Sequence, residues 1–399
     1  MRVHSRTTVL TASLTLALVA GPLAAPALPA SASTTSAATA SAATASAAFP
    51  AAAALRAAIT GLPSADATAA LVRVGGTDGV WRGSSGVHDL ATGRPADPDA
   101  RFRAGSTTKV VTAAAVLALA AQGRVDLGTP VQHYLPGLFT GAFAPITVRQ
   151  LLNHTSGIRS GDGWDDSFDA QYAHRFDTLT PQQVVRSAVA KGPEFAPGTR
   201  QDYLNINYTV LGLLIEKVTG RSYATEVTRL VLRPAGMRDS YFPGTDPRIR
   251  GPHNHGYQKV TRADGTTSLV DVTDWNQADR FAAGDMISTT ADLERLLTSL
   301  FRGRIVPPGP QLAEMFTVPA HIAGATYSAG LQRFEYEGQV YWLKSGARYG
   351  YDALLLGTRD LSRTLVYSVN ATDAKGEDMN PVAQRIALAA LDRQARQPQ

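Results

Sequence analysis

The chain has 399 residues, of which 44% are hydrophobic, and its formal net charge is +5. This length and composition support one large core, either undivided or with an inserted lobe. The basic residues form no run that would follow a phosphate backbone, so nucleic acid is not expected as a partner. The absence of cysteine excludes disulfides, thiolate zinc sites and cysteine nucleophiles.

The N-terminus has the order of a secretory signal peptide. Arg2 and Arg6 precede an apolar run over residues 9–25, and small residues follow up to Ala32. A retained membrane anchor is the alternative, but glycine and proline interrupt the run, which is short for a bilayer span of ~20 residues. We therefore predict a signal peptide over residues 1–32, a secreted, extracellular protein, and no membrane anchor after cleavage.

Residues 33–48 are almost entirely alanine, serine and threonine. A segment without large side chains or a periodic pattern cannot bury a core, so we predict a flexible tether. The folded domain is then expected over residues 49–399. Loss of Arg2 and Arg6 leaves the mature chain at +3, which would allow attraction to an anionic cell wall.

Runs typical of β-strands occur near both ends of this domain, and its middle has the pattern of helices and loops. The expected strands cover 70–74, 80–87, 327–334, 340–344, 353–357 and 364–370. The expected helices cover 51–59, 106–121, 208–218, 290–301 and a C-terminal segment around 386–391. Strands from distant segments predict an α/β (α+β) fold, in which an antiparallel sheet carries a helical lobe inserted roughly over 122–308.

Ser106-Thr107-Thr108-Lys109 opens the helix expected over 106–121, which is apolar on every face and should be buried. One turn separates the Ser106 hydroxyl from the Lys109 amine, so the two side chains can meet. Burial lowers the pKa of a lysine, and a neutral amine can accept the serine proton. A capped helix with a snorkelling lysine is the alternative, but this lysine has no easy route to water.

Tyr203 and Asn205 lie two residues apart on an expected extended loop, so their side chains should face one pocket. The Tyr203 phenol can relay a proton, and the Asn205 amide can hold a substrate carbonyl or orient Lys109. Taken alone, this pair would be interpreted as a packed tyrosine and a turn asparagine.

Lys344-Ser345-Gly346 ends an expected strand of apolar and aromatic residues. A glycine at that position lets a substrate backbone approach the edge of a sheet and pair with it as an added strand. Lys344 supplies positive charge for a carboxylate or for the tyrosine. The backbone N–H of Ala347 is placed to serve as a second oxyanion donor.

Together the three elements have the order and spacing of the serine penicillin-recognising enzymes. The chain resembles the branch that contains D-alanyl-D-alanine carboxypeptidases, class C β-lactamases and related esterases, in which the middle element is Y-x-N. The similarity runs from about residue 69 to 370 and includes the segments 102–109, 150–157, 195–199, 211–212, 283–289 and 292–293. It implies a β-lactamase/transpeptidase-like fold, with an antiparallel sheet flanked by helices, an all-helical lobe, and the active site between them.

The resemblance also implies a division of roles. The catalytic residues are Ser106, Lys109 and Tyr203, with Ser106 as the nucleophile and either Lys109 or the Lys109–Tyr203 pair as the base. The substrate-binding residues are Asn205, Lys344, Ser345 and Gly346. The oxyanion hole consists of the backbone N–H groups of Ser106 and Ala347. Tyr203 then activates water for deacylation, and neither a metal ion nor an organic cofactor is expected.

Two departures from the family pattern bear on the substrate. Lys344 stands where many carboxypeptidases and esterases of this branch carry histidine, and Ala347 lacks a hydroxyl that often helps to hold a substrate carboxylate. Arg333 or Arg348 would have to supply that charge. We expect a D-alanyl-D-alanine carboxypeptidase acting on peptidoglycan stem peptides. A class C-type β-lactamase is the second expectation, an esterase the third, and a non-catalytic penicillin-binding module the fourth.

The histidines have other interpretations. His154 could be interpreted as the base of a Ser-His-Asp triad. The chain has no G-x-S-x-G elbow, however, and we interpret this histidine as structural. His253 and His255 lie in a loop without a helical spacing or a clear third ligand, so a metal site is not expected there.

Overall fold

The computed structural model describes residues 49, 51–164, 167–262 and 264–392. The predicted signal peptide (1–32) and the predicted tether (33–48) therefore lie outside the described residues. None of the helices in the described part of the chain has the length and apolar character needed to cross a bilayer.

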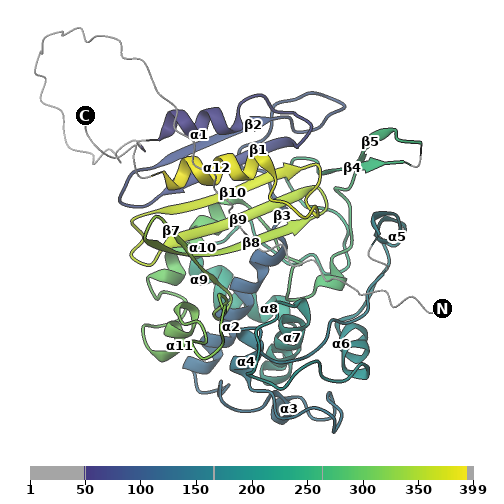
Figure 1. The fold of residues 1–399 in the computed structure, drawn as a ribbon, viewed down its shortest axis with the longest axis vertical. Coiled ribbons are helices and arrows are strands. Elements are labelled where there is room, and N and C mark those ends of the chain that lie inside the picture. The colour runs from purple at the N-terminus through teal and green to yellow at the C-terminus, as the bar shows by residue number, and fades with distance from the viewer. Residues whose placement is uncertain (1–48, 50, 165–166, 263, 393–399) are drawn as a thin grey trace, which may run out of the picture.

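A six-stranded antiparallel sheet forms the upper half of the molecule in Figure 1. Its strands are β1 (Ala67–Gly75), β2 (Trp81–Gly86), β7 (Gln332–Tyr336), β8 (Gln339–Arg348), β9 (Tyr351–Thr358) and β10 (Thr364–Ala371). Their order is β2-β1-β10-β9-β8-β7, so the first and last parts of the domain pair in the centre, through β1 and β10. The predicted fold class, an antiparallel sheet of distant segments flanked by helices, is confirmed.

Strand β8 differs from its predicted limits in a way that matters for the site. It continues to Arg348, so Lys344-Ser345-Gly346 lies within the strand and not at its end. Strand β7 begins only at Gln332, five residues later than predicted, and pairs with residues 339–343 of β8. The remaining residues of β8 pair with β9 on one side only, and their other edge is left for another extended chain.

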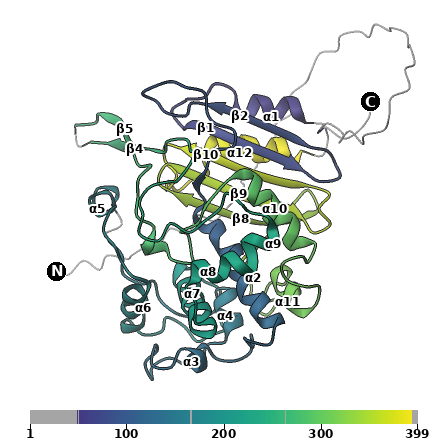
Figure 2. The same ribbon diagram turned by 180° about the vertical axis from the view of Figure 1, so that it is seen from behind.

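The two faces of the sheet are covered by different helices. Helices α1 (Ala52–Ile59) and α12 (Pro381–Leu391) cover one face, and α10 (Thr290–Phe301) covers part of the other, as Figures 1 and 2 show from opposite sides. Side chains of β9 alternate between two cores, because successive residues of a strand point to opposite faces. Leu354 and Leu356 join the core under α1 and α12, whereas Ala353 and Leu355 join the core shared with the helices below the sheet.

The lower half consists mainly of helices around α2 (Thr108–Ala121). The others are α3 (Val131–Tyr134), α4 (Val148–Leu152), α5 (Phe168–Ala173), α6 (Pro181–Ala190), α7 (Asn205–Thr219), α8 (Tyr223–Val227), α9 (Arg233–Ala235) and α11 (Pro310–Ala313). The middle of the chain also contains β-structure that was not predicted. This is the hairpin of β4 (Tyr257–Thr261) and β5 (Thr267–Asp271) and the short pair of β3 (Phe102–Arg103) and β6 (Ile287–Ser288).

Helix α2 is buried along almost its whole length, as its uniformly apolar sequence predicts. The helix itself begins at Thr108, however, and the preceding residues Gly105–Thr107 form a 3₁₀ turn, η1. Gly105 has φ of 52°, a left-handed conformation that glycine adopts without steric cost. Ser106 therefore lies on a tight turn that leads into the helix, and not within the helix as predicted.

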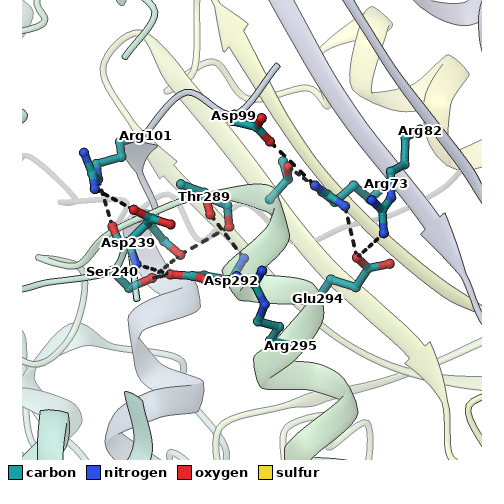
Figure 3. A network of polar contacts seen from close by, with 12 residues as sticks. Arg73, Arg82, Asp99, Arg101, Asp239, Ser240, Thr289, Asp292, Glu294 and Arg295 are labelled. Atoms are coloured by element: carbon teal, nitrogen blue, oxygen red, sulfur yellow. Dashed lines mark hydrogen bonds and ion pairs between the residues drawn. The ribbon is translucent and has the colours of Figure 1, made fainter. Parts of the chain in front are cut away.

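A polar network fixes α10 and the segment before it (Figure 3). The fully buried Asp292 accepts hydrogen bonds from the Asp239 backbone N–H at 2.8 Å and from the Ser240 hydroxyl at 2.9 Å. Glu294 pairs with Arg73 of β1 at 3.3 Å. Thr289 caps the helix by accepting the N–H of Asp292. These contacts hold the start of α10 on the sheet.

The sheet meets α2 where β8 lies against η1. A Cβ atom on Gly346 would lie 2.1 Å from the carbonyl oxygen of Ala104 and 2.9 Å from the nitrogen of Ser106. A Cβ atom on Gly105 would lie 2.6 Å from the nitrogen of Ala347. Only a pair of glycines permits this approach, which brings the backbone of β8 onto the turn that carries Ser106.

We predict that Gly346→Ala destabilises the protein, because its methyl group would collide with backbone atoms that cannot rotate away. Overpacking of this kind costs about 1–3 kcal/mol in free energy of unfolding. Urea titration followed by circular dichroism measures the change. Gly141→Ala is the matched control, because a Cβ atom there meets no atom within 4 Å. Equal stability of the two variants would contradict the packing described.

Candidate active site

Ser106 and Lys109 meet at the junction of η1 and α2. The Ser106 residue is half-buried, whereas Lys109 is 0% exposed. The Lys109 Nζ lies 3.1 Å from the Ser106 Oγ and also donates to the Asn205 Oδ1 and the Ala283 carbonyl oxygen, each at 2.7 Å. These are the three contacts that a lysine amine can make, and they hold it against the hydroxyl.

The surroundings of Lys109 disfavour its charged form. Burial lowers its pKa well below the usual range, and the positive charges of Lys344, Arg280 and Lys375 lower it further. The negative charge of Asp285 acts in the opposite direction. A neutral amine within hydrogen-bonding distance of a serine hydroxyl is suited to accept the serine proton.

Tyr203 lies between the two lysines of the site. Its ring centroid is 5.0 Å from the Lys109 Nζ and 4.7 Å from the Lys344 Nζ. Its hydroxyl oxygen is buried without a hydrogen bond of normal geometry, and burial raises the pKa of the phenol well above 10, while the Ser106 side chain lowers it. Tyr203 is therefore a protonated phenol at neutral pH, which favours Lys109 as the first base and Tyr203 as a proton donor.

Asn205 does not lie on the extended loop that was predicted for it. It is the first residue of α7, and Leu204 before it, with φ of −135° and ψ of 143°, is the last extended residue. The side chain still reaches the site, because its Oδ1 accepts the Lys109 amine. Of its two sequence-based roles, the structure shows the orientation of Lys109, and the amide NH2 end remains to meet a substrate carbonyl.

The third element contributes from β8. Lys344 is 4% exposed, its Nζ donates to the Ser345 carbonyl oxygen at 2.9 Å, and burial lowers its pKa to about 7. Ser345 and Ala347 are half-buried on the other face of the strand. Because β8 lies directly on η1, the backbone nitrogens of Ser106 and Ala347, the two predicted oxyanion donors, are brought to the same place.

The two arginines considered for a substrate carboxylate each lie within 4 Å of an acid, at different distances. Arg333 pairs with Glu335 at 2.8 Å on the exposed side of β7. Arg348 is buried at the end of β8, with Asp279 3.8 Å away. Lys344, whose Nζ lies 4.7 Å from the Tyr203 ring centroid, is the third candidate cation.

His154 lies under the site as a packing residue, in agreement with the structural interpretation. Its ring centroid is 4.5 Å from that of Tyr203 and its Nδ1 accepts the Leu204 backbone N–H at 3.4 Å. Burial, followed by the charges of Lys109 and Lys344, lowers its pKa well below 6.5. The imidazole is therefore neutral and supports the Tyr203 loop.

Sequence reasoning missed the segment 282–286, which supplies acceptors to α2. Besides the Ala283 oxygen that receives Lys109, the Ala282 oxygen accepts the Thr112 hydroxyl at 2.6 Å. The segment was noticed only as part of a family likeness, and carbonyl oxygens carry no sequence signal. Elsewhere, His88 lies beside His253 and His255, but the described residues include no group of three or more His, Cys, Asp or Glu side chains arranged to hold a metal ion.

Comparison with known protein families gives a match to the model described as Beta-lactamase over residues 55–390. Esterase EstB from Burkholderia gladioli is 33% identical over 199 residues, which cover 46% of this chain and 49% of the esterase. Protein flp from Staphylococcus aureus (strain COL) is 32% identical over 213 residues, covering 52% of this chain and 40% of that protein. The matched part thus spans half or less of the length of these relatives.

Solved structures match over more of the chain. A D-stereospecific amidohydrolase from Streptomyces sp. has a TM-score of 0.73 and 33% identity, covering 85% of this chain and 98% of that one. A D-amino acid amidase from Ochrobactrum anthropi SV3, complexed with D-phenylalanine, has a TM-score of 0.67 and 25% identity, with coverage of 81% and 94%. A penicillin-binding protein homologue from Pyrococcus abyssi, at 23% identity and a TM-score of 0.67, shares the fold.

We predict that Lys109→Ala and Tyr203→Phe affect acylation unequally. Loss of a general base lowers the rate by roughly 10²–10⁴-fold. The Tyr203 variant keeps the buried amine and is expected to lose about tenfold or less in acylation, since general acid–base assistance is only partly removed. Stopped-flow labelling with a fluorescent penicillin measures both rates.

Exposed Lys191, which pairs with Asp162, supplies the control variant Lys191→Ala, which should acylate at the wild-type rate. If Tyr203→Phe slowed acylation as much as Lys109→Ala, the phenol and not the amine would be the first base.

Proposed function

Since the chain belongs to the beta-lactamase family, we propose that it is a serine hydrolase that cleaves amide bonds after D-amino acid residues through an acyl-enzyme. The observation that carries this proposal is the fully buried Lys109 amine, hydrogen-bonded at once to the Ser106 hydroxyl and to Asn205. Burial removes water from this amine, which is energetically unfavourable for its charged form. The resulting neutral amine is suited to act as a base.

In the acylation step, the Ser106 oxygen attacks the substrate carbonyl carbon while its proton passes to the Lys109 amine. The developing oxyanion is met by the backbone N–H groups of Ser106 and Ala347. As the bond to the leaving nitrogen breaks, the Tyr203 hydroxyl donates its proton to that nitrogen and is reprotonated from Lys109. The products are an ester on Ser106 and a free amine.

Deacylation reverses these proton movements. A water molecule attacks the ester carbonyl and gives its proton to the Tyr203–Lys109 pair, and the Ser106 oxygen takes a proton back as the acid leaves. The raised pKa of Tyr203 and the lowered pKa of Lys109 are consistent with this exchange, because the protonated phenol can donate a proton and the neutral amine can accept one.

The substrate class is supported by two kinds of observation. The D-stereospecific amidohydrolase from Streptomyces sp. is matched over 98% of its length, and the other amidase also acts on D-amino acid derivatives by its name. The free edge of β8 offers a place for an extended peptide beside Ser106. We therefore propose an amide or peptide with a D-residue on its acyl side.

Within that class, a D-alanyl-D-alanine carboxypeptidase of peptidoglycan stem peptides is the more specific proposal. It requires a cation for the terminal carboxylate, and we assign that role to Lys344, because its Nζ lies 4.7 Å from the Tyr203 ring centroid. Arg333 pairs with Glu335 at 2.8 Å, and Arg348 lies 3.8 Å from Asp279. With a pKa of about 7, Lys344 carries only part of its charge at neutral pH. An uncharged C-terminal amide should therefore compete well with the free acid.

We predict that fluorescent penicillin labels the wild type and not Ser106→Ala, and that the wild type hydrolyses N-acyl-D-Ala-D-Ala and N-acyl-D-Ala amide. Removal of the nucleophile should lower turnover by roughly 10³-fold or more. The corresponding L-alanine substrates are the controls for stereospecificity. A cephalosporin and a short-chain ester test the β-lactamase and esterase alternatives.

Faster turnover of the cephalosporin or of the ester than of every D-alanyl substrate would replace the proposed activity with the alternative. Labelling without turnover of any substrate would instead identify a penicillin-binding module.

We also propose that the protein is exported and cleaved near Ala32, from the order of basic, apolar and small residues at its N-terminus. Expression of the full chain in a bacterial host should then yield, in the medium, a protein whose intact mass corresponds to a chain that starts near Ser33. A full-length chain that remains with the membrane fraction would contradict this.

A further inference from the structure

A buried acid lies in the turn that accepts the Lys109 amine and has no part in the mechanism above. Asp285 is 5% exposed and belongs to the segment 282–286, which connects η3 (Ala278–Arg280) to β6. Burial of an acid is energetically unfavourable unless the carboxyl group accepts hydrogen bonds or interacts with an opposite charge. Asp285 accepts a backbone hydrogen bond, and its charge acts on Lys109.

Asp285 closes the turn that receives the Lys109 amine. Its Oδ1 accepts the backbone N–H of Ala282 at 3.1 Å, and Ala282 has φ of 58°, a left-handed conformation that is unfavourable for alanine. The carbonyl oxygen of Ala283, the next residue, accepts the Lys109 Nζ at 2.7 Å. A carboxylate that stabilises this strained turn therefore holds one of the three acceptors of the amine.

The same turn is fastened to α2 at further points. The Ala282 oxygen accepts the Thr112 hydroxyl, and the Met286 N–H donates to the Thr108 hydroxyl at 3.1 Å. Thr108 and Thr112 lie one turn apart on the helix and flank Lys109. Displacement of the turn would therefore move the Ala283 carbonyl oxygen and change the position of the Lys109 amine.

The charge of Asp285 also reaches Lys109. Among the groups that act on the amine, Lys344, Arg280 and Lys375 disfavour its protonated form, and Asp285 favours it. The groups that face Asp285 itself are Asp279 and Arg348, from η3 and β8, and Tyr223, from α8. Burial raises the pKa of Asp285 to about 7, so its negative charge is present above that pH and is lost below it.

We propose that Asp285 is a positioning residue for Lys109: its carboxylate closes the turn that accepts the amine and places a negative charge beside it. The inference rests on the proposed function, in which Lys109 is the base. Asp285 contacts neither substrate nor nucleophile in this scheme and acts only through the lysine. Its charge raises the pH below which the amine is protonated and acylation stops.

The test is the acid limb of the pH profile for acylation by a fluorescent penicillin. Asp285→Asn keeps an Oδ1 acceptor for the Ala282 N–H and removes the charge. Without the negative charge, Lys109 loses its proton more easily, so the limb should move to lower pH by about 0.5–1 unit. Asp285→Glu keeps the charge and should restore the wild-type limb. Asp285→Ser, also uncharged and able to accept a hydrogen bond, replaces the asparagine variant if that variant is unstable.

The matched control is Asp352→Asn. Asp352, half-buried on β9, is another acid whose pKa is raised, to about 8, by removal from water, but it is not among the groups that act on Lys109. The acid limb of the pH profile of Asp352→Asn should coincide with that of the wild type. Asp285→Ala, which also removes the acceptor, should lower the maximal acylation rate by roughly 10- to 100-fold through misplacement of the amine.

Two outcomes overturn the proposal. One is an acid limb of Asp285→Asn that coincides with the wild-type limb, and the other is a full maximal rate in Asp285→Ala. Either result with a normally labelled wild type refutes the role of Asp285 and leaves the proposed function standing. Failure of the wild type itself to be labelled or to turn over any substrate would refute the proposed function instead.

Discussion

The burial of one amine is the constraint on which the rest of the site depends. Lys109 lies in a helix whose other residues are apolar or small, so its amine can be satisfied only by the Ser106 hydroxyl, the Asn205 amide and the Ala283 carbonyl. Each acceptor comes from a different part of the chain. The amine thereby joins the 3₁₀ turn, the start of α7 and the segment before β6, and its desolvation makes it a base.

The sheet provides the second half of the site by a close approach of backbones. Glycine at 346 and at 105 lets β8 lie on the nucleophile turn, which no side chain at either position would allow. Because β8 extends beyond β7, the strand that touches Ser106 also presents a free edge to a substrate. The same five residues, 344–348, thus supply both the free edge proposed for the substrate and the Ala347 N–H proposed for the oxyanion.

The charge of Lys344 lowers the pKa of the other lysine of the site, Lys109. Both amines lie over the ring of Tyr203, at 5.0 and 4.7 Å from its centroid, and both are buried. The positive charge of Lys344 disfavours a second positive charge on Lys109 in this poorly hydrated site, so proton loss from Lys109 relieves the repulsion. The negative charge of Asp285 acts in the opposite direction and favours protonated Lys109. In the proposed mechanism, protonated Lys109 returns a proton to Tyr203 after the phenol has protonated the leaving nitrogen.

The sequence by itself determined the class of fold, the buried helix and the residue types of the site. The periodicity of apolar residues along helices and strands indicates directly which residues are buried. Ser106, Lys109, Tyr203 and Lys344 belong to motifs whose spacing follows from the geometry that the chemistry needs. The end of β8, the 3₁₀ turn under Ser106 and the helical position of Asn205 were set by tertiary contacts. So were the pairing of both arginines with acids and the acceptor role of the Ala283 carbonyl. Local sequence carries no signal for these features, because an acceptor carbonyl, a free strand edge or an ion pair exists only once distant segments have packed together.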